Sequence, residues 1–113
     1  MLERLNRVNL LSDIYGPLLT GRQRQVLDLY YREDLSLGEI AAEFGISRQA
    51  VYDLIRRAVG TLEELEQKLG LWQYFKFQQE RLVEAESILK KQELEAGDRR
   101  RLQELVHELL QKL

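Results

Sequence analysis

The sequence contains no cysteine, one proline and seven glycines in 113 residues. Without cysteine there is neither a disulfide framework nor a thiolate metal site, which fits a cytoplasmic protein. No apolar run approaches the roughly eighteen residues of a membrane span, and residues 1–13 lack a signal-peptide cleavage pattern. We therefore expect a cytoplasmic protein that does not insert into a membrane, built mostly from helices because helix-breaking residues are few.

Patterns of catalytic and cofactor-binding sites are also missing. The glycines are scattered singly, so no glycine-rich loop is present to hold a phosphate. The single histidine, His107, lies between Glu104 and Glu108 on a leucine-rich stretch, where a surface residue is far more common than a metal ligand. Clustered glutamates such as Glu63 and Glu64 are better explained as exposed helix charges. We predict that the chain is not an enzyme and binds no metal or cofactor.

The formal net charge is −2, with 44% hydrophobic and 32% charged residues, as in a globular domain. Residues 1–60 carry eight basic and eight acidic side chains, and residues 61–113 carry nine and eleven. DNA-binding domains usually show a basic footprint. The even balance therefore leaves direct nucleic-acid binding to be decided by the placement of individual arginines.

Hydrophobic periodicity predicts an all-α chain with no strand. A first helix of about 13 residues ends before Gly16-Pro17, and a second begins after a capping box of Thr20 and Gln23 and ends near Arg32. Gly60 followed by Thr61 and Glu64 resembles another capping box, so we expect a kink or restart there. The later helices are an amphipathic one from Leu62 to about Glu95, with Gly70 as a candidate break, and a last one after Gly97-Asp98.

Residues 37–57, LGEIAAEFGISRQAVYDLIRR, match a helix-turn-helix. Gly45 falls at the turn, where a positive φ is needed, and Ala41 lies where two helices cross closely. Ser36 with Glu39 forms a capping box for the first helix, and Ser47 is a good N-cap for the second. The predicted motif core is Ile40, Ala41, Phe44, Gly45, Ile46, Val51 and Leu54, with Val51 and Leu54 on the inner face of the second helix.

The outward face of the second motif helix holds the candidate nucleic-acid contacts. Arginine pairs bidentately with guanine and glutamine with adenine, while a helix N-terminus can contact phosphate. Asp53 opposes phosphate unless it meets a cytosine amine. The alternative is an ordinary solvated face, with the arginines paired to Asp53, Glu39 or Glu43. The candidate residues are Ser47, Arg48, Gln49, Tyr52, Arg56 and Arg57, and Arg22 and Arg24 are further phosphate candidates.

From residue 61 the chain becomes a charged, leucine-rich helical tail. Its apolar residues recur at three- and four-residue steps, which favours helix pairing. We expect two parts: residues 1–60, the helix-turn-helix domain with its N-terminal helix, and residues 61–113, an amphipathic tail that packs on the first helix, mediates a homodimer, or does both. The candidate oligomer surface is Leu2, Leu5, Trp72, Phe75, Leu82 and Leu89.

Two family resemblances follow from these motifs. Residues 18–68 resemble region 4 of bacterial sigma factors, a winged-helix-like fold, through the stretches RQRQVLDL, SLGEIA and GISR. The whole chain is more similar to the YlxM-like helix-turn-helix family, through Arg7, Asn9, Leu11, Asp13, Tyr15, Gly16, Leu18, Leu19 and Thr20, the segment ISRQAVYD and the acidic tail.

The YlxM-like resemblance implies a regulator of the signal recognition particle pathway, with the particle's GTPase, its receptor or its RNA as partner. The sigma-like motif favours a second function, sequence-specific binding of DNA in transcription. A third is a protein-interaction adaptor in which the helix-turn-helix serves only as a folding unit. The chain is too short to hold the other domains of a sigma factor.

Overall fold

The computed structural model describes residues 2–112, and the side chains of residues 6–112. Every regular element in this part of the chain is helical, so the all-α prediction is confirmed. The elements are α1 (Leu2–Tyr15), a 3-10 turn (Gly16–Leu18), α2 (Gly21–Leu27), a π-helical turn (Asp28–Arg32), α3 (Leu37–Phe44), α4 (Arg48–Leu69), α5 (Leu71–Leu89) and α6 (Ala96–Gln111). Within residues 2–112, no helix combines the length and the apolar character that crossing a membrane requires.

The chain forms two compact units, one ending at Trp72 and the other starting at Gln73. This boundary lies in the first turn of α5, later than the one expected at residue 60. Part of the expected tail, from Leu62 to Trp72, therefore belongs to the first unit. The difference arises because α4 continues through residue 60 without interruption.

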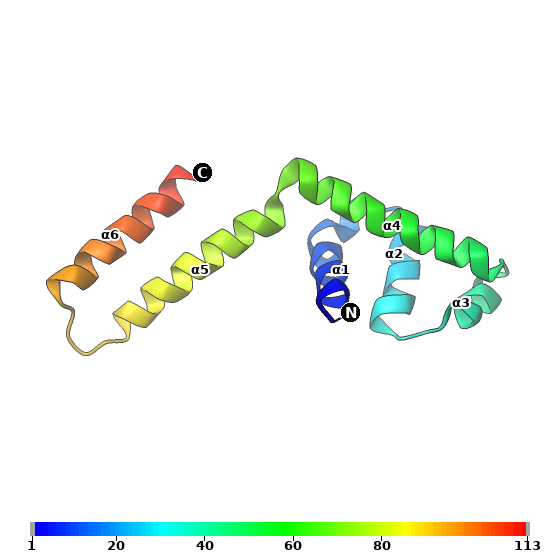
Figure 1. Ribbon diagram of the computed structural model, residues 1–113, viewed down its shortest axis with the longest axis horizontal. Helices are drawn as coiled ribbons and strands as arrows, with labels where there is room; N and C mark the ends of the chain where they lie inside the picture. The colour runs from blue at the N-terminus through cyan, green and yellow to red at the C-terminus, as the bar shows by residue number, and fades with distance from the viewer. Residues whose placement is uncertain (1, 113) are drawn as a thin grey trace. The chain divides into compact units, whose positions relative to one another are not determined.

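The first unit is organised along α4. The helices α1, α2 and α3 all contact α4 and lie on one side of it (Figure 1). The face of α4 that they cover has buried apolar residues at steps of four, three and four, which is the periodicity of one helix face. These residues are Val51, Ile55, Ala58 and Leu62.

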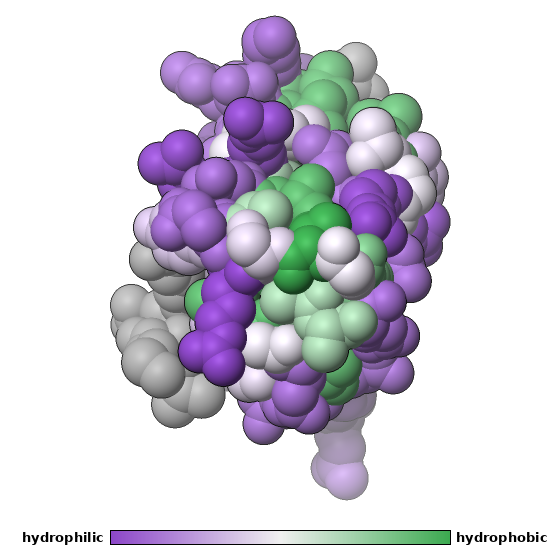
Figure 2. Space-filling model, turned by 90° about the vertical axis from the view of Figure 1, so that its right-hand side faces the viewer, coloured by the Kyte–Doolittle hydropathy of each residue, from purple (hydrophilic) through white to green (hydrophobic). Residues whose placement is uncertain are grey.

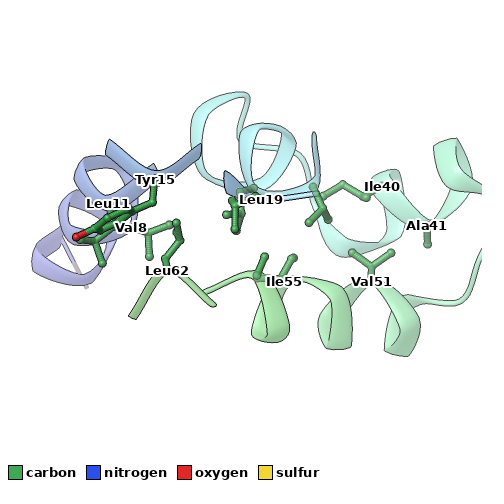
Figure 3. Close-up of a cluster of buried hydrophobic side chains, with 12 residues drawn as sticks. Val8, Leu11, Tyr15, Leu19, Ile40, Ala41, Val51, Ile55 and Leu62 are labelled. Carbon is green, nitrogen blue, oxygen red and sulfur yellow. The ribbon is translucent and has the colours of Figure 1, made fainter. Parts of the chain in front are cut away.

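Figure 3 shows how this face packs: Leu62 points toward Val8 and Leu11 of α1, and Val51 points toward Ile40 of α3. Both residues of the expected inner pair, Val51 and Leu54, pack on the core; Leu54 is partly buried, and Ile55, which was not expected there, is buried. Three helices cover α4, and the middle of its covered face runs through Val51 and Ile55 while Leu54 lies at the edge of that face.

The expected restart at Gly60 is wrong. Residues on both sides of it, Ala58 and Leu62, are fully buried, and α4 runs straight through. Thr61 does not cap a new helix, because its hydroxyl donates to the Arg57 carbonyl at 3.0 Å. A glycine in a helix costs about 1 kcal/mol relative to alanine, less than burying the apolar side chains around it contributes.

At Gly70 the helix does break, as the sequence indicates, with φ at 62° in the left-handed region. Two side chains take up the free N–H groups at the start of α5. The Tyr15 hydroxyl donates to Glu66 Oε1 at 2.6 Å and accepts from the Leu71 N–H at 3.1 Å. The same Glu66 oxygen accepts from the Trp72 N–H at 3.0 Å. A buried carboxylate thus satisfies helix donors that would otherwise be unpaired.

Arg7 and Trp72 complete this junction. Arg7 forms a bidentate pair with Glu63 at 2.7 and 2.8 Å, and its guanidinium lies 5.1 Å from the centre of the Trp72 ring. The hydrogen bond from Arg7 lowers the pKa of the Glu63 carboxyl. Residues from α1, α4 and the first turn of α5 are therefore held together by polar contacts as well as by apolar packing.

The second unit is a hairpin of α5 and α6, which run antiparallel (Figure 1). Between them lie the buried Ile88 and Leu105, flanked by ion pairs of Arg81 with Glu108 and of Arg101 with Glu84. The hydrogen bond from Arg101 lowers the pKa of Glu84. The hairpin therefore combines a narrow apolar contact with charged edges.

The ends of these helices differ from the expectation. The helix α5 ends at Leu89, earlier than the expected Glu95. Gly97-Asp98 lies inside α6 instead of separating two helices. Glu95 and Asp98 form a capping box, in which the Asp98 carboxylate accepts from the Glu95 N–H, and this box starts α6.

Replacing Ile40 by alanine should lower the free energy of unfolding by about 2–4 kcal/mol, because it leaves a cavity beside Val51. Urea denaturation followed by circular dichroism measures the change. Leu18→Ala is the matched control, since Leu18 is 62% exposed and its loss should cost less than about 0.5 kcal/mol. Equal losses in the two variants would contradict this account of the core.

Tyr15→Phe should lower the free energy of unfolding by about 1–3 kcal/mol near neutral pH, because the Leu71 N–H loses its acceptor. Burial, and then the hydrogen bond to Glu66, raise the pKa of Tyr15 above its ordinary value of 10.0. The folded chain thus holds this proton more tightly than the unfolded chain. The stabilisation is complete below pH 10 and is lost as the pH rises through the folded-state pKa.

The measurement is chemical denaturation of wild type and Tyr15→Phe at neutral pH and above pH 10. The difference in the free energy of unfolding between wild type and Tyr15→Phe should be smaller above pH 10 than at neutral pH. Tyr52→Phe, which removes a hydroxyl from a half-exposed ring, serves as the control and should show neither effect. A constant difference across the whole pH range would mean that Tyr15 does not titrate as described.

Candidate nucleic-acid interface

The helix-turn-helix is formed by α3, the turn at residues 45–47, and α4. Gly45 adopts φ 69° and ψ 34°, the left-handed conformation that ends α3 and that glycine takes without a Cβ penalty. The Ser36 hydroxyl accepts from the Glu39 N–H at 3.1 Å, and the Ser47 hydroxyl accepts from the Ala50 N–H at 3.0 Å. Local sequence therefore fixes where both helices of the motif begin.

Six of the seven expected core residues pack in the interior of this motif. Ile40, Ala41 and Val51 are buried. Phe44, Ile46 and Leu54 are partly buried and pack against the same cluster, while Gly45 is exposed at the turn. Ile55 and Ala58 also belong to the core, and they were not predicted from the sequence. They follow Val51 by four and seven residues, which is the spacing of one helix face and could have indicated them.

Four residues of α4 point away from the core and form what we call the α4 face: Gln49, Tyr52, Asp53 and Arg56. Their spacing of three, four and seven residues places them on one side of the helix, opposite Val51 and Ile55. Tyr52 is 49% exposed. The Gln49 amide donates to the Asp53 carboxylate at 3.2 Å, so this carboxylate is engaged within its own helix.

Arg48 lies beside the α4 face but is directed onto α3. A Cβ atom placed on Gly38 would come within 3.1 Å of the Arg48 guanidinium, so this side chain rests where any residue but glycine has a side chain. A glycine in the first turn of a helix, such as Gly38, indicates that another group packs closely there. Only the structure shows that this group is the Arg48 side chain.

Two further arginines reach this unit from α2, in different directions. The Arg22 guanidinium stacks 3.9 Å from the centre of the Phe44 ring, at the end of α3 next to the turn. Arg24 instead lies against Gly16, where a Cβ would approach its guanidinium to 3.4 Å. Of the two phosphate candidates on α2, only Arg22 therefore joins the helix-turn-helix.

The ion pairs of the first unit leave these arginines uncompensated. Among the described side chains, Arg7 and Arg32 pair with Glu63 and Asp13. Within the same range, no ion pair within 4.0 Å is formed by Arg22, Arg24, Arg48, Arg56 or Arg57. The suggested ion pairs of these arginines with Asp53, Glu39 or Glu43 are therefore not formed among the described side chains, and a solvated face stays the alternative interpretation.

Two of the three acidic neighbours are engaged in hydrogen bonds of their own. Glu39 accepts from the Ser36 N–H as part of the capping box, and Asp53 accepts from Gln49. Between residues 46 and 60 the chain carries three arginines and one carboxylate, so the first half of α4 is locally cationic although the whole unit is not. Figure 2, which faces the end where α3 and α4 meet, shows a small hydrophobic area surrounded by hydrophilic residues.

An exposed aromatic ring between polar and cationic side chains, next to a capped helix N-terminus, can contact bases and phosphates. Arg57 points to another side of α4 than Arg56, one helical step of about 100° away. The described side chains place no three histidine, aspartate or glutamate residues where they could hold a metal ion together.

The six residues of the candidate oligomer surface have different environments. Trp72 packs against the core of the first unit and under Arg7, so it is not available as a separate surface. Phe75, Leu82 and Leu89 are exposed on α5. Leu2 and Leu5 fall outside the side chains that the structure describes.

Comparison with known proteins gives a consistent result. The family model described as "Putative helix-turn-helix protein, YlxM / p13 like" (UPF0122) matches residues 2–106. UPF0122 proteins of Bacillus mycoides (strain KBAB4), Bacillus cereus (strain AH187) and Bacillus thuringiensis subsp. konkukian are each 50% identical over 93 residues, which is 82% of this chain and 84% of the relative. The chain therefore belongs to the YlxM/p13-like family of helix-turn-helix proteins.

Proposed function

We propose that this protein is a nucleic-acid-binding regulator that contacts its target through the α4 face. The observation that carries the proposal is the set of arginines without ion pairs, Arg22, Arg48, Arg56 and Arg57, around the helix-turn-helix. The nearby carboxylates Glu39 and Asp53 are held in intrahelical hydrogen bonds. Arginines without ion pairs, two of whose three acidic neighbours accept hydrogen bonds elsewhere, favour an anionic ligand.

The roles follow from the chemistry of each side chain. Arg48 and Gln49 lie at the N-terminal end of α4, where a helix presents side chains to base edges, and they suit guanine and adenine respectively. Arg56, Arg57 and Arg22 suit phosphate oxygens. Tyr52 supplies an exposed ring for contact with a base or sugar.

We place this regulation in the signal recognition particle pathway, an expectation that rests on the family resemblance. The nucleic acid of that pathway is the particle's RNA, and the alternative target is duplex DNA read by the sigma-like motif. Each makes a different demand on the α4 face, because the major groove of an RNA helix is too narrow for side-chain readout. RNA binding is therefore expected at loops or bulges, and DNA binding in the major groove.

Fluorescence anisotropy with the particle RNA and with random duplex DNA, at several salt concentrations, tests the proposal. Three or four phosphate contacts predict a slope of about −3 when the logarithm of the observed association constant is plotted against the logarithm of the salt concentration. Arg56→Gln should weaken binding severalfold and reduce the magnitude of that slope by about one, because one phosphate contact is removed. Arg48→Gln should also weaken binding.

Arg100→Gln is the matched control, since it makes the same charge change on an exposed residue of α6 outside the helix-turn-helix. Its affinity and salt slope should stay at the wild-type values. Equal effects of Arg56→Gln and Arg100→Gln would indicate nonspecific attraction. Binding to the particle's GTPase or receptor that survives both Arg48→Gln and Arg56→Gln, with no nucleic-acid binding by wild type, would identify an adaptor instead.

Gly38→Ala tests whether nucleic-acid binding needs the position of the Arg48 side chain on α3 or only its positive charge. The new methyl group pushes the guanidinium off α3, which is inexpensive because the side chain is long and exposed. Alanine also favours the helix by about 0.5–1 kcal/mol over glycine. We expect a slightly higher melting temperature and an affinity for nucleic acid within about twofold of wild type. A loss of affinity as large as that of Arg48→Gln would mean that Arg48 must rest on Gly38 to act.

A further inference from the structure

The hairpin of α5 and α6 leaves much of its apolar surface uncovered. Among its described residues only Ile88 and Leu105 are buried. A unit of about 40 residues normally needs disulfides, a metal or association to be stable, and this chain has no cysteine. The hairpin therefore lacks an internal source of stability that would match its regular helices.

The contacts within the hairpin define which side of each helix faces the other. Arg81 and Glu84 of α5 pair with Glu108 and Arg101 of α6, and the buried Ile88 and Leu105 lie three or four residues away on the same helix faces. The Phe77 ring lies 5.2 Å from the Lys112 amine at the far end of the same seam. These positions fix the inner face of both helices.

A second apolar stripe lies on each helix, about 130° around from its inner face at 100° per residue. On α5 it consists of Phe75, Leu82 and Leu89, which are seven residues apart. On α6 it consists of Leu102, Val106 and Leu110, which are four apart. On both helices the stripe is reached by turning about 130° in the same sense from the inner face. Because the helices are antiparallel, this places both stripes on the same side of the hairpin. We call these six residues the hairpin face.

The hairpin face is exposed and apolar, whereas the opposite side is polar. Five of its six side chains are between 45% and 63% exposed, and Leu102 is half-buried. Leu102, Val106 and Leu110 line a shallow hollow together with Arg99, Gln103 and His107. The opposite side carries Lys76, Glu80, Arg100 and Glu104, with Val83 as its one large apolar residue. An apolar side backed by a polar one is the pattern of half of a helical bundle.

We propose that the hairpin face binds the hairpin face of a second copy of this chain, forming a four-helix bundle with two-fold symmetry. Its apolar residues on α5 follow a seven-residue repeat, which is the spacing of paired helices. The hairpin carries eight basic and eight acidic residues from residue 73 onward, so two copies do not repel each other through net charge.

The size of the face also fits a second copy. The 19 residues of α5 span about 28 Å, and two helices side by side are about 20 Å across, which gives on the order of 600 Å² per copy. A standard protein interface buries about 800 Å² per partner. The face therefore reaches the lower end of the range for stable interfaces, which is about 600 Å² per partner.

The test measures the mass of the full chain by sedimentation equilibrium over a range of concentrations. Wild type should be a dimer. Leu82→Glu should weaken self-association by about 100-fold or more, because the two-fold symmetry buries the new charge twice. Val83→Glu is the matched control: its residue is adjacent, similarly exposed at 52% against 48%, and on the polar side. It should remain a dimer.

A second measurement does not depend on a disruptive substitution. Because the chain has no native cysteine, Leu82→Cys and Val83→Cys each introduce a single thiol. The thiol at position 82 should react slowly with a maleimide at high protein concentration and rapidly after dilution. The thiol at position 83 should react rapidly at both concentrations.

Three results would overturn the proposal. One is a monomeric wild type across the concentration range. Another is protection at position 82 that does not change on dilution, which would mean that the chain's own first unit covers the face. The third is equal loss of self-association in Leu82→Glu and Val83→Glu. None of these readouts involves nucleic acid, so they are independent of the proposed function.

Discussion

Burial of one continuous face of α4 is the constraint on which the first unit depends. Val51, Ile55, Ala58 and Leu62 follow a single helical stripe, and three short helices cover it from end to end. None of α1, α2 or α3 exceeds 14 residues, so each obtains most of its stability from packing on α4 and little from propensity. This requirement also explains why α4 runs through Gly60 without a break.

The same helix connects the core to the candidate site. Its inner side is held by packing, which fixes the rotation of α4 and with it the direction of Gln49, Tyr52 and Arg56. A binding face carried on a rigid, buried helix needs little ordering when a ligand arrives. The position of the α4 face is thus a consequence of the packing of α4 on the core.

The end of α4 solves a different problem. Ending one helix and starting another at Gly70 leaves N–H groups without partners, and apolar residues cannot supply acceptors. Tyr15 and Glu66 provide them from inside the unit, although burying a carboxylate is costly unless it is fully hydrogen-bonded. The second unit has no comparable interior, and several large apolar side chains of its described residues stay exposed.

Local codes in the sequence were sufficient for the helices and most of their ends. Capping boxes at Thr20 and Ser36, the N-cap at Ser47 and the glycines at 45 and 70 each act over a few residues, so one stretch of sequence determines them. The family also followed from the sequence, since its motifs are contiguous. Where a competing local signal was outweighed by burial, as at Gly60 and Thr61, the sequence misled.

What the sequence could not decide is which side chains meet across long separations. Arg7 and Glu63 are 56 residues apart, and so are Tyr15 and Leu71. The assignment of Arg32 to Asp13, with Arg48 and Arg56 left unpaired, depends on how α1 and the turn after α2 pack together. The number of charged residues in the sequence is the same whichever arginines form ion pairs, so it cannot tell them apart. The sequence by itself determined an all-α helix-turn-helix protein, and the tertiary structure decided which of its arginines carry free charge, because ion pairing depends on distances that only packing sets.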